Sequence, residues 1–144
     1  MSEWESFLPK YVCERLQSMM DVQFVVDLGI ETRSITKDGE VRCVMNVSDK
    51  LNAYGGGHGG AVFALADQAF ALASNMGKEK QVAMVASINY IKPGTGVLEA
   101  VARRTSETKK TSLYEVKVFD DGKLVAVFQG TGYKIGEKRP TASR

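Results

Sequence analysis

The chain has 144 residues, with 19 basic and 17 acidic side chains, a net charge of +2 and 44% hydrophobic residues. This length predicts one domain, which we expect over residues 1–135, followed by a polar, basic and disordered tail over 136–144. The near balance of charges gives no whole-protein case for nucleic acid as a partner. Glu3, Trp4 and Glu5 stand where a signal peptide would need a basic start, and Cys13 and Cys43 have no metal or redox spacing. We therefore expect a cytoplasmic protein.

The N-terminal third predicts one helix and two strands. Apolar residues from Trp4 to Met20 recur at three- and four-residue spacing, which indicates an amphipathic helix that Pro9 either bends or begins. Between Val22 and Ile30 apolar residues occupy every second position, which predicts a half-buried strand. Asp38-Gly39 predicts a hairpin turn into a second strand over Val41–Val47.

A long apolar segment from Gly59 to Met76 predicts a central helix, with Gly77 as its left-handed C-terminal stop. Its apolar residues are not confined to one stripe, so we expect protein to cover most of its sides. The segment is slightly short for a membrane span and is interrupted by Asp67-Gln68, so we expect no membrane partner.

Four further strands are expected after this helix, over Val82–Ile91, Val97–Thr105, Ser112–Phe119 and Lys123–Tyr133. Asp121-Gly122 predicts a hairpin between the last two. No strand–helix–strand alternation recurs to build a parallel sheet. The order of elements therefore predicts an α+β domain, with the long helix against the concave face of an antiparallel sheet.

The start and the middle of the central helix carry the candidate chemistry. Asp67 is an isolated carboxylate in an apolar helix, where desolvation raises a pKa unless donors reach the group. A structural aspartate is the alternative, but we favour a functional one. Gly59 and Gly60 present backbone N–H groups at the positive end of the helix, which suits an oxyanion. His58 could be a base or a metal ligand, yet no Cys, Asp or Glu stands beside it at ligand spacing, so we expect no metal and a loop-orienting role.

Gly59 and Asp67 are separated by about 12 Å of helical rise. A single reacting centre cannot easily meet both residues in one chain. Two antiparallel copies of the helix could bring the start of one beside the middle of the other. A symmetric dimer with two shared sites follows as a hypothesis.

A specific set of short motifs resembles a known family. The set comprises Asn52, His58-Gly59-Gly60, Leu65-Ala66-Asp67, Tyr90-Ile91-Lys92-Pro93 and Gly130-Thr131-Gly132-Tyr133. Together with the order of elements from about Asp21 to Tyr133, it resembles the hotdog-fold acyl-CoA thioesterases of the phenylacetic acid degradation protein type.

The resemblance implies roles for individual residues. Asp67 would activate the attacking water as general base or attack as nucleophile. The Gly59 N–H, helped by Asn52, would polarise the thioester carbonyl, and His58 would support the loop. No metal and no cofactor would be needed, since CoA is part of the substrate. The expected assembly is a homodimer with shared sites, arranged further as a dimer of dimers.

Two positions depart from the family pattern. Ala83 stands where relatives often carry a Ser or Thr facing the catalytic acid, so Ser87, Asn89 or no residue would take that place. Gly57 precedes His58 where relatives usually carry a larger residue, which could widen the pocket or loosen the loop.

The substrate-binding candidates divide into a CoA set and an acyl set. Basic side chains near strand ends suit the CoA phosphates, although solvated surface is the usual role of such charges. Aromatic residues near the helix start suit the acyl group, although simple packing is as common. The CoA set is Lys92, Arg103, Arg104, Lys109 and Lys110; Tyr54 and Phe63 would line the acyl pocket, with Gly60, Ala83 and Pro93 beside the substrate.

The predicted reaction is hydrolysis of an acyl-CoA with a small to medium or aromatic acyl group. One alternative is a hotdog hydratase or dehydratase, which would pair a histidine with an acid on a hydroxyacyl chain. The other is a module that binds acyl-CoA without catalysis, in which Asp67 would have little use.

Overall fold

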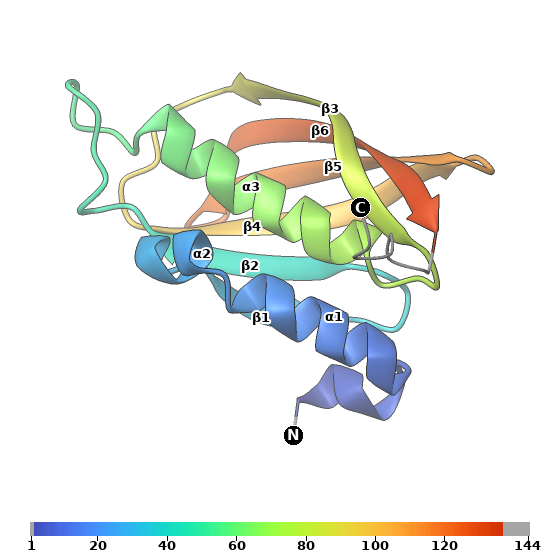
Figure 1. Cartoon of the computed structure of the whole chain (residues 1–144). Coiled ribbons are helices and arrows are strands. Elements are labelled where there is room, and N and C mark those ends of the chain that lie inside the picture. Colours follow the sequence, from blue (N-terminus) through green and yellow to red (C-terminus); the bar gives the residue numbers. More distant parts are fainter. Residues whose placement is uncertain (1, 137–144) are drawn as a thin grey trace, which may run out of the picture.

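The computed structural model describes residues 2–136 and contains one layer of sheet with a long helix, α3, lying across it (Figure 1). The sheet has six antiparallel strands in the order β1-β2-β4-β5-β6-β3, so β1 and β3 form its edges. The predicted α+β class with a curled antiparallel sheet is confirmed. The elements are the 3₁₀ helix η1 (Glu3–Ser6), α1 (Lys10–Met20), α2 (Gln23–Leu28), β1 (Glu31–Ile35), β2 (Val41–Asn46), α3 (Gly59–Ser74), β3 (Lys80–Tyr90), β4 (Val97–Glu107), β5 (Thr111–Asp120) and β6 (Lys123–Gly136).

The core lies between α3 and the sheet. α3 contacts strands β2 to β6 with one face, which buries Leu65, Ala69 and Phe70. The Phe70 ring lies so close to β6 that a Cβ at Gly130 would come within 2.9 Å of it. Gly130 therefore lets the helix approach the sheet, and most of the stability of α3 comes from this packing.

The strand predicted over Val22–Ile30 is wrong, because residues 23–28 form the helix α2 and the first strand begins only at Glu31. Gly29 adopts a left-handed φ of 71°, and the Ile30 N–H bonds to the Val25 carbonyl at 3.1 Å. This is a Schellman helix ending. Glycine followed by an apolar residue was the missed signal, and the period-two pattern alone was misleading in so short a segment.

The ending predicted for the central helix is also wrong. α3 ends at Ser74, and Gly77 does not have a positive φ. The Asn75 side chain instead donates to the Ala71 carbonyl at 2.9 Å. Arg15 of α1 donates to the carbonyls of Asn75, Gly77 and Lys78 at 2.7–3.1 Å. The Asn75 amide thus satisfies a carbonyl of the last helical turn, and the Arg15 cation satisfies carbonyls of the segment that follows the helix.

The remaining boundaries are close to prediction. Pro9 lies immediately before α1 and starts it. Asp121 and Gly122 have φ values of 50° and 79°, as a two-residue hairpin turn requires. The predicted tail lies outside the described residues from position 137 onward.

Candidate active site

A glycine-rich loop leads into α3 and is packed closely on the segment that follows β3. A Cβ at Gly56 would lie 2.9 Å from the Pro93 side chain, and one at Gly57 would lie 3.1 Å from the Gly94 carbonyl oxygen. The Gly57 N–H donates to that same carbonyl at 2.6 Å. Gly57 therefore permits a tight contact here and does not loosen the loop.

Asn52 holds the shape of this loop. Its side-chain oxygen accepts from the Tyr54 N–H at 2.8 Å and from the Gly56 N–H at 3.1 Å. The Asn52 amide NH₂ has no acceptor within residues 2–136, so it can donate to a ligand. Tyr54 projects from the loop and is 96% exposed in this chain.

His58 is the N-cap of α3. Its Nδ1 accepts from the Gly60 N–H at 3.0 Å, and its carbonyl accepts from the N–H groups of Ala61 and Val62. The Gly59 N–H is left without an acceptor in the described part of the chain. The expectation that His58 orients the loop agrees with this geometry, and Gly59 is the free donor at the helix start.

Tyr90, at the end of β3, fixes the position of Gly59. The Tyr90 hydroxyl donates to the Gly59 carbonyl at 2.8 Å, and a Cβ at Gly59 would meet the Tyr90 ring and hydroxyl at 3.2 Å. Burial raises the pKa of Tyr90, which keeps its hydroxyl protonated as a donor. The sequence motif included Tyr90, but no pattern in the sequence assigned it this role.

A hollow of about 390 Å³ opens beside the free Gly59 N–H. It brings together Asn52, Gly59, Lys92 and Pro93, four of the residues that the sequence singled out. Its walls mix backbone, an amide, an ammonium and apolar groups. The residues that line it are Asn52, Gly57, Gly59, Val62, Tyr90, Ile91, Lys92, Pro93, Gly94 and Val125.

Asp67 lies two turns further along α3, on the face that neither the sheet nor α1 covers. That face is a stripe of small side chains at Gly60, Ala64 and Ala71, with Asp67 among them, all half-buried or exposed. Burial raises the pKa of Asp67. Within residues 2–136 no donor bonds to its carboxylate, so nothing offsets the desolvation.

The alternatives for a partner of Asp67 can be placed on β3. Tyr90 and Ile88 face α3 and the core, so Ser87 and Asn89 point to the opposite face by strand alternation. Ala83 precedes a bulge in the pairing of β3 with β6. β3 therefore offers the Asp67 of its own chain no hydroxyl at these positions.

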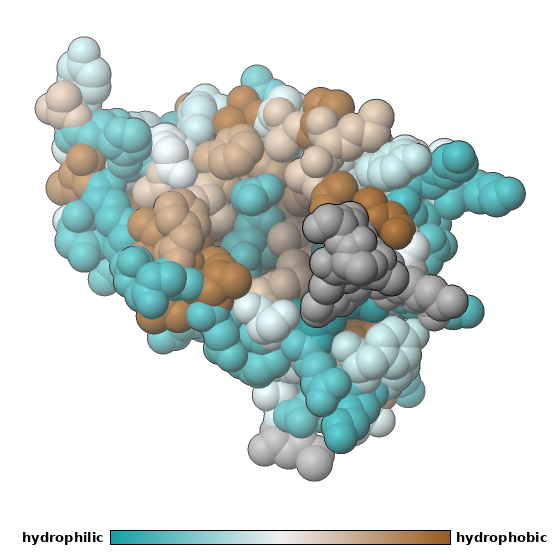
Figure 2. All heavy atoms as spheres, viewed as in Figure 1, coloured by the Kyte–Doolittle hydropathy of each residue, from teal (hydrophilic) through white to brown (hydrophobic). Residues whose placement is uncertain are grey.

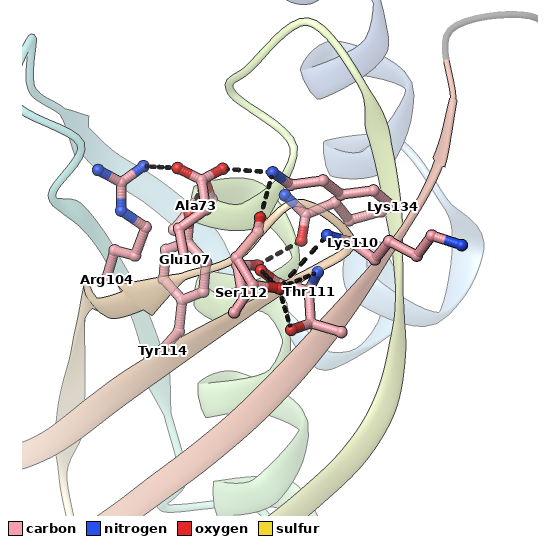
Figure 3. A network of polar contacts seen from close by, with 10 residues as sticks. Ala73, Arg104, Glu107, Lys110, Thr111, Ser112, Tyr114 and Lys134 are labelled. Carbon is pink, nitrogen blue, oxygen red and sulfur yellow. Dashed lines mark hydrogen bonds and ion pairs between the residues drawn. The ribbon is translucent and has the colours of Figure 1, made fainter.

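The remaining candidate residues are not gathered at this end of the molecule. Arg103 pairs with the buried Glu40 at the opposite end of the sheet. Arg104 lies at the same end and pairs with Glu107 at 3.1 Å (Figure 3). Lys109 follows β4 at the same far end and has no ion-pair partner among the described residues. Phe63 packs edge-on against Phe128, with ring centroids 5.3 Å apart, so it belongs to the core.

Two further properties bear on the chemistry. Within residues 2–136, no group of three His, Cys, Asp or Glu side chains is arranged to hold a metal ion. No helix in the same part of the chain has the length and apolar character to span a membrane.

Comparison with known proteins is consistent with this geometry. The family model of the thioesterase superfamily matches residues 54–127, which include His58, Gly59 and Asp67. The acyl-coenzyme A thioesterase PaaI of Escherichia coli K12 is 33% identical over 112 residues, covering 76% of this chain and 80% of the relative.

Solved structures show the same likeness. That of the E. coli PaaI protein from the phenylacetic acid degradation operon has a TM-score of 0.79 at 31% identity, covering 87% of this chain and 94% of that chain. A thioesterase protein from Streptococcus pneumoniae TIGR4, determined with coenzyme A, has a TM-score of 0.69 at 28% identity, covering 76% and 91%. The chain therefore belongs to the thioesterase superfamily and has the hotdog fold that its sequence motifs predicted.

Proposed function

We propose that the protein hydrolyses an acyl-CoA thioester with a small to medium or aromatic acyl group, giving the free acid and CoA. The observation that carries the proposal is the Gly59 N–H, which is fixed beside a hollow at the positive end of α3 and has no acceptor among residues 2–136. Membership of the thioesterase superfamily supports the reaction class. The relative named acyl-coenzyme A thioesterase supports the substrate class.

The residues around Gly59 can stabilise the transition state. The thioester oxygen accepts from the Gly59 N–H and from the Asn52 amide, so negative charge develops against fixed donors. Tyr90 holds Gly59 from its carbonyl side, and His58 keeps the Gly60 N–H occupied. His58 thus acts on the loop and leaves proton transfer to another group. No metal or cofactor takes part in the proposed reaction.

Asp67 supplies the base or the nucleophile. A carboxylate with a raised pKa is a better proton acceptor than an ordinary aspartate, provided that it is ionised at the working pH. Either Asp67 takes a proton from the attacking water, and the tetrahedral intermediate then expels the CoA thiolate, or its oxygen attacks the carbonyl and displaces the CoA thiolate to give a mixed anhydride, which water then cleaves to the free acid and the regenerated carboxylate. Both paths use the same donors for the oxyanion.

Asp67 and Gly59 meet in a dimer. Among the described residues β3 pairs only with β6, and its exposed side chains include Val82, Met84 and Val85. Within residues 2–136, the stripe of small residues around Asp67 on α3 is half-buried or exposed as well. A second copy placed by a two-fold axis along β3 would extend the sheet and lay its α3 antiparallel to the first. Gly59 of each copy would then lie beside Asp67 of the other.

The same two-fold axis would also bring basic residues of the two copies together. The far end of one sheet, with Arg103, Arg104 and Lys109, would approach the Gly59 end of the other copy, where Lys92 lies. We assign the CoA phosphates to this combined basic region. A further pairing of dimers is expected through the outer face of the sheet, where Arg42 and Glu99 alternate in charge. We place the activity in the cytoplasm, where the free thiols Cys13 and Cys43 stay reduced.

The test is incubation of the purified protein with acetyl-, hexanoyl- and phenylacetyl-CoA while free thiol is measured. Thiol release above the uncatalysed rate is expected for at least one of them. A bound acyl-CoA that stays intact would show a binding module instead. Water addition to an enoyl-CoA without thiol release would show a hydratase.

A further inference from the structure

A second hollow, of about 300 Å³, lies on the other side of the first turn of α3. Most of its lining side chains are apolar, and we name it the Phe24 hollow. Figure 2 shows hydrophobic atoms gathered over the region of α2. The ammonium of Lys50 is bonded away from it to the Asn46 carbonyl and the Asp49 carboxylate, at 2.9 and 2.8 Å. The Phe24 hollow is lined by Phe24, Leu28, Lys50, Leu51, His58, Gly60 and Ala61.

The helix α2 builds this hollow. Val25 and Ile30 are buried and anchor the helix to the core, while Phe24 and Leu28, one turn apart, face the start of α3. Phe24 is 66% exposed in the described chain. An ordered helix therefore presents a large aromatic ring to solvent, next to the proposed oxyanion donor.

The chemistry of a thioester requires two binding regions at this point. Its acyl group and its sulfur leave the carbonyl carbon in different directions, so each contacts a different part of the surface around the carbonyl. The first turn of α3, which begins with the free Gly59 N–H, separates the two hollows. The hollow with Asn52 and Lys92 offers polar partners to the pantetheine amides and phosphates. The Phe24 hollow offers mostly hydrocarbon.

We propose that the Phe24 hollow binds the acyl group and that Phe24, Leu28 and Leu51 set the acyl preference. This assignment rests on the proposed function. The volume of about 300 Å³ is at the small end for ligand sites, so a medium-chain or phenyl-bearing acyl group fits and a long fatty chain does not. The acyl pocket expected from Tyr54 and Phe63 is thereby reassigned to α2 and the loop before α3.

The experiment measures two quantities for wild type, Phe24→Ala and Leu51→Ala. The first is kcat/KM for acetyl-, butanoyl-, hexanoyl- and phenylacetyl-CoA. The second is the affinity, by calorimetry, for ethyl- and hexyl-CoA thioethers, which cannot be hydrolysed. Val26→Ala is the matched control, because Val26 is exposed on the same helix and does not line the hollow.

Phe24→Ala is expected to lower kcat/KM for hexanoyl- and phenylacetyl-CoA about tenfold, with little change for acetyl-CoA. Leu51→Ala should act in the same direction, and Val26→Ala should leave the ratio between substrates unchanged. An equal effect on all four substrates, or none, would overturn the assignment while wild-type turnover still supports hydrolysis. If wild type releases no thiol, the proposed function fails. The hexyl/ethyl affinity ratio then still decides whether the hollow binds the chain.

Discussion

At the C-terminal end of α3 side chains take up the backbone carbonyls, whereas at the N-terminal end one backbone N–H has no acceptor among residues 2–136. Arg15 alone bonds to three carbonyls beyond Ser74. Near the same end the buried Tyr114 hydroxyl donates to the Ala73 carbonyl at 3.3 Å (Figure 3). Gly59, at the opposite end, lies between two hollows.

The difference separates stability from function within one helix. We call the C-terminal end of α3 the closed end and the N-terminal end the open end. Hydrogen-bonded carbonyls at the closed end lower the free energy of the folded state. The unpaired Gly59 N–H at the open end contributes nothing to folding, and it remains available to a ligand. Changes at the open end should therefore alter turnover, and changes at the closed end should alter unfolding.

The largest effect is expected from Asp67→Asn, which keeps the shape of the side chain and removes the base or nucleophile. We expect kcat to fall about a hundredfold or more, with substrate affinity retained. Thiol release and binding of an acyl-CoA thioether measure the two quantities. Asp21→Asn, an exposed carboxylate on the surface, is the control. Normal turnover in Asp67→Asn would contradict the mechanism.

The pH dependence of the same pair of proteins follows from the raised pKa. Turnover of wild type should fall as pH falls through the pKa of Asp67, because the base must be ionised. A carboxyl pKa that is higher in the folded than in the unfolded state stabilises at low pH and loses this contribution as pH rises through the folded value. Asp67→Asn should therefore unfold at higher urea than wild type at neutral pH. That gain should vanish below the ordinary aspartate pKa of about 4.

Subunit mixing tests whether the open end needs a second copy. Asp67→Ala and His58→Ala chains, each folded and inactive alone, are unfolded together and refolded. Random pairing makes half of the dimers hybrids, and each hybrid has one intact shared site. Activity should recover to about a quarter of wild type. If hybrids form and stay inactive, each chain builds its site alone.

Tyr90→Phe should make the position of the Gly59 N–H less fixed without removing this donor. Loss of the hydroxyl frees the Gly59 carbonyl, so the N–H on the same residue is held less firmly. We expect kcat to fall about tenfold while KM changes little, because the donor matters most as charge develops on the oxygen. The apparent pKa in the pH–rate profile should not move, since Asp67 is unchanged. A shifted profile would mean that Tyr90 itself transfers a proton.

Arg15→Met is the matching change at the closed end. Three carbonyls lose a charged donor, and we expect a loss of about 2 kcal/mol in the free energy of unfolding. Urea denaturation measures it, and kcat of the folded protein should equal that of wild type. A large loss of kcat would show that the two ends of α3 are coupled.

The sequence predicted the start of α3 at Gly59 correctly and its end at Gly77 wrongly. His58, Gly59 and Asp67 follow one another within a single helix, so local spacing sufficed to place them. Arg15 bonds to carbonyls 60 or more positions away in the chain, and no local pattern contains that information. The helix stop was therefore assigned to Gly77, the nearest glycine.

The restriction to local patterns also explains why the sequence misassigned α2 and grouped the basic residues wrongly. Six residues are too few for periodicity to separate a helix from a strand, and Gly29 was the only local signal. Arg103 and Lys92 looked like one group in the sequence because both lie near strand ends. Antiparallel pairing puts those strand ends at opposite ends of the sheet, and only the proposed second copy would bring them together.

The smallest effect is expected from the far basic end, which the two-fold would place near the CoA phosphates. Raising the salt concentration should increase KM for acyl-CoA and leave kcat almost unchanged, because screened charges contribute to binding and not to the chemical step. Lys109→Met should raise KM about threefold at low salt, the usual contribution of one exposed charge. The variant should also show a weaker salt dependence than wild type. Lys10→Met, which removes an exposed lysine from α1, should behave like wild type. If neither salt nor Lys109→Met changes KM, this end is not part of the binding site, because phosphates bound there would respond to the loss or screening of a positive charge.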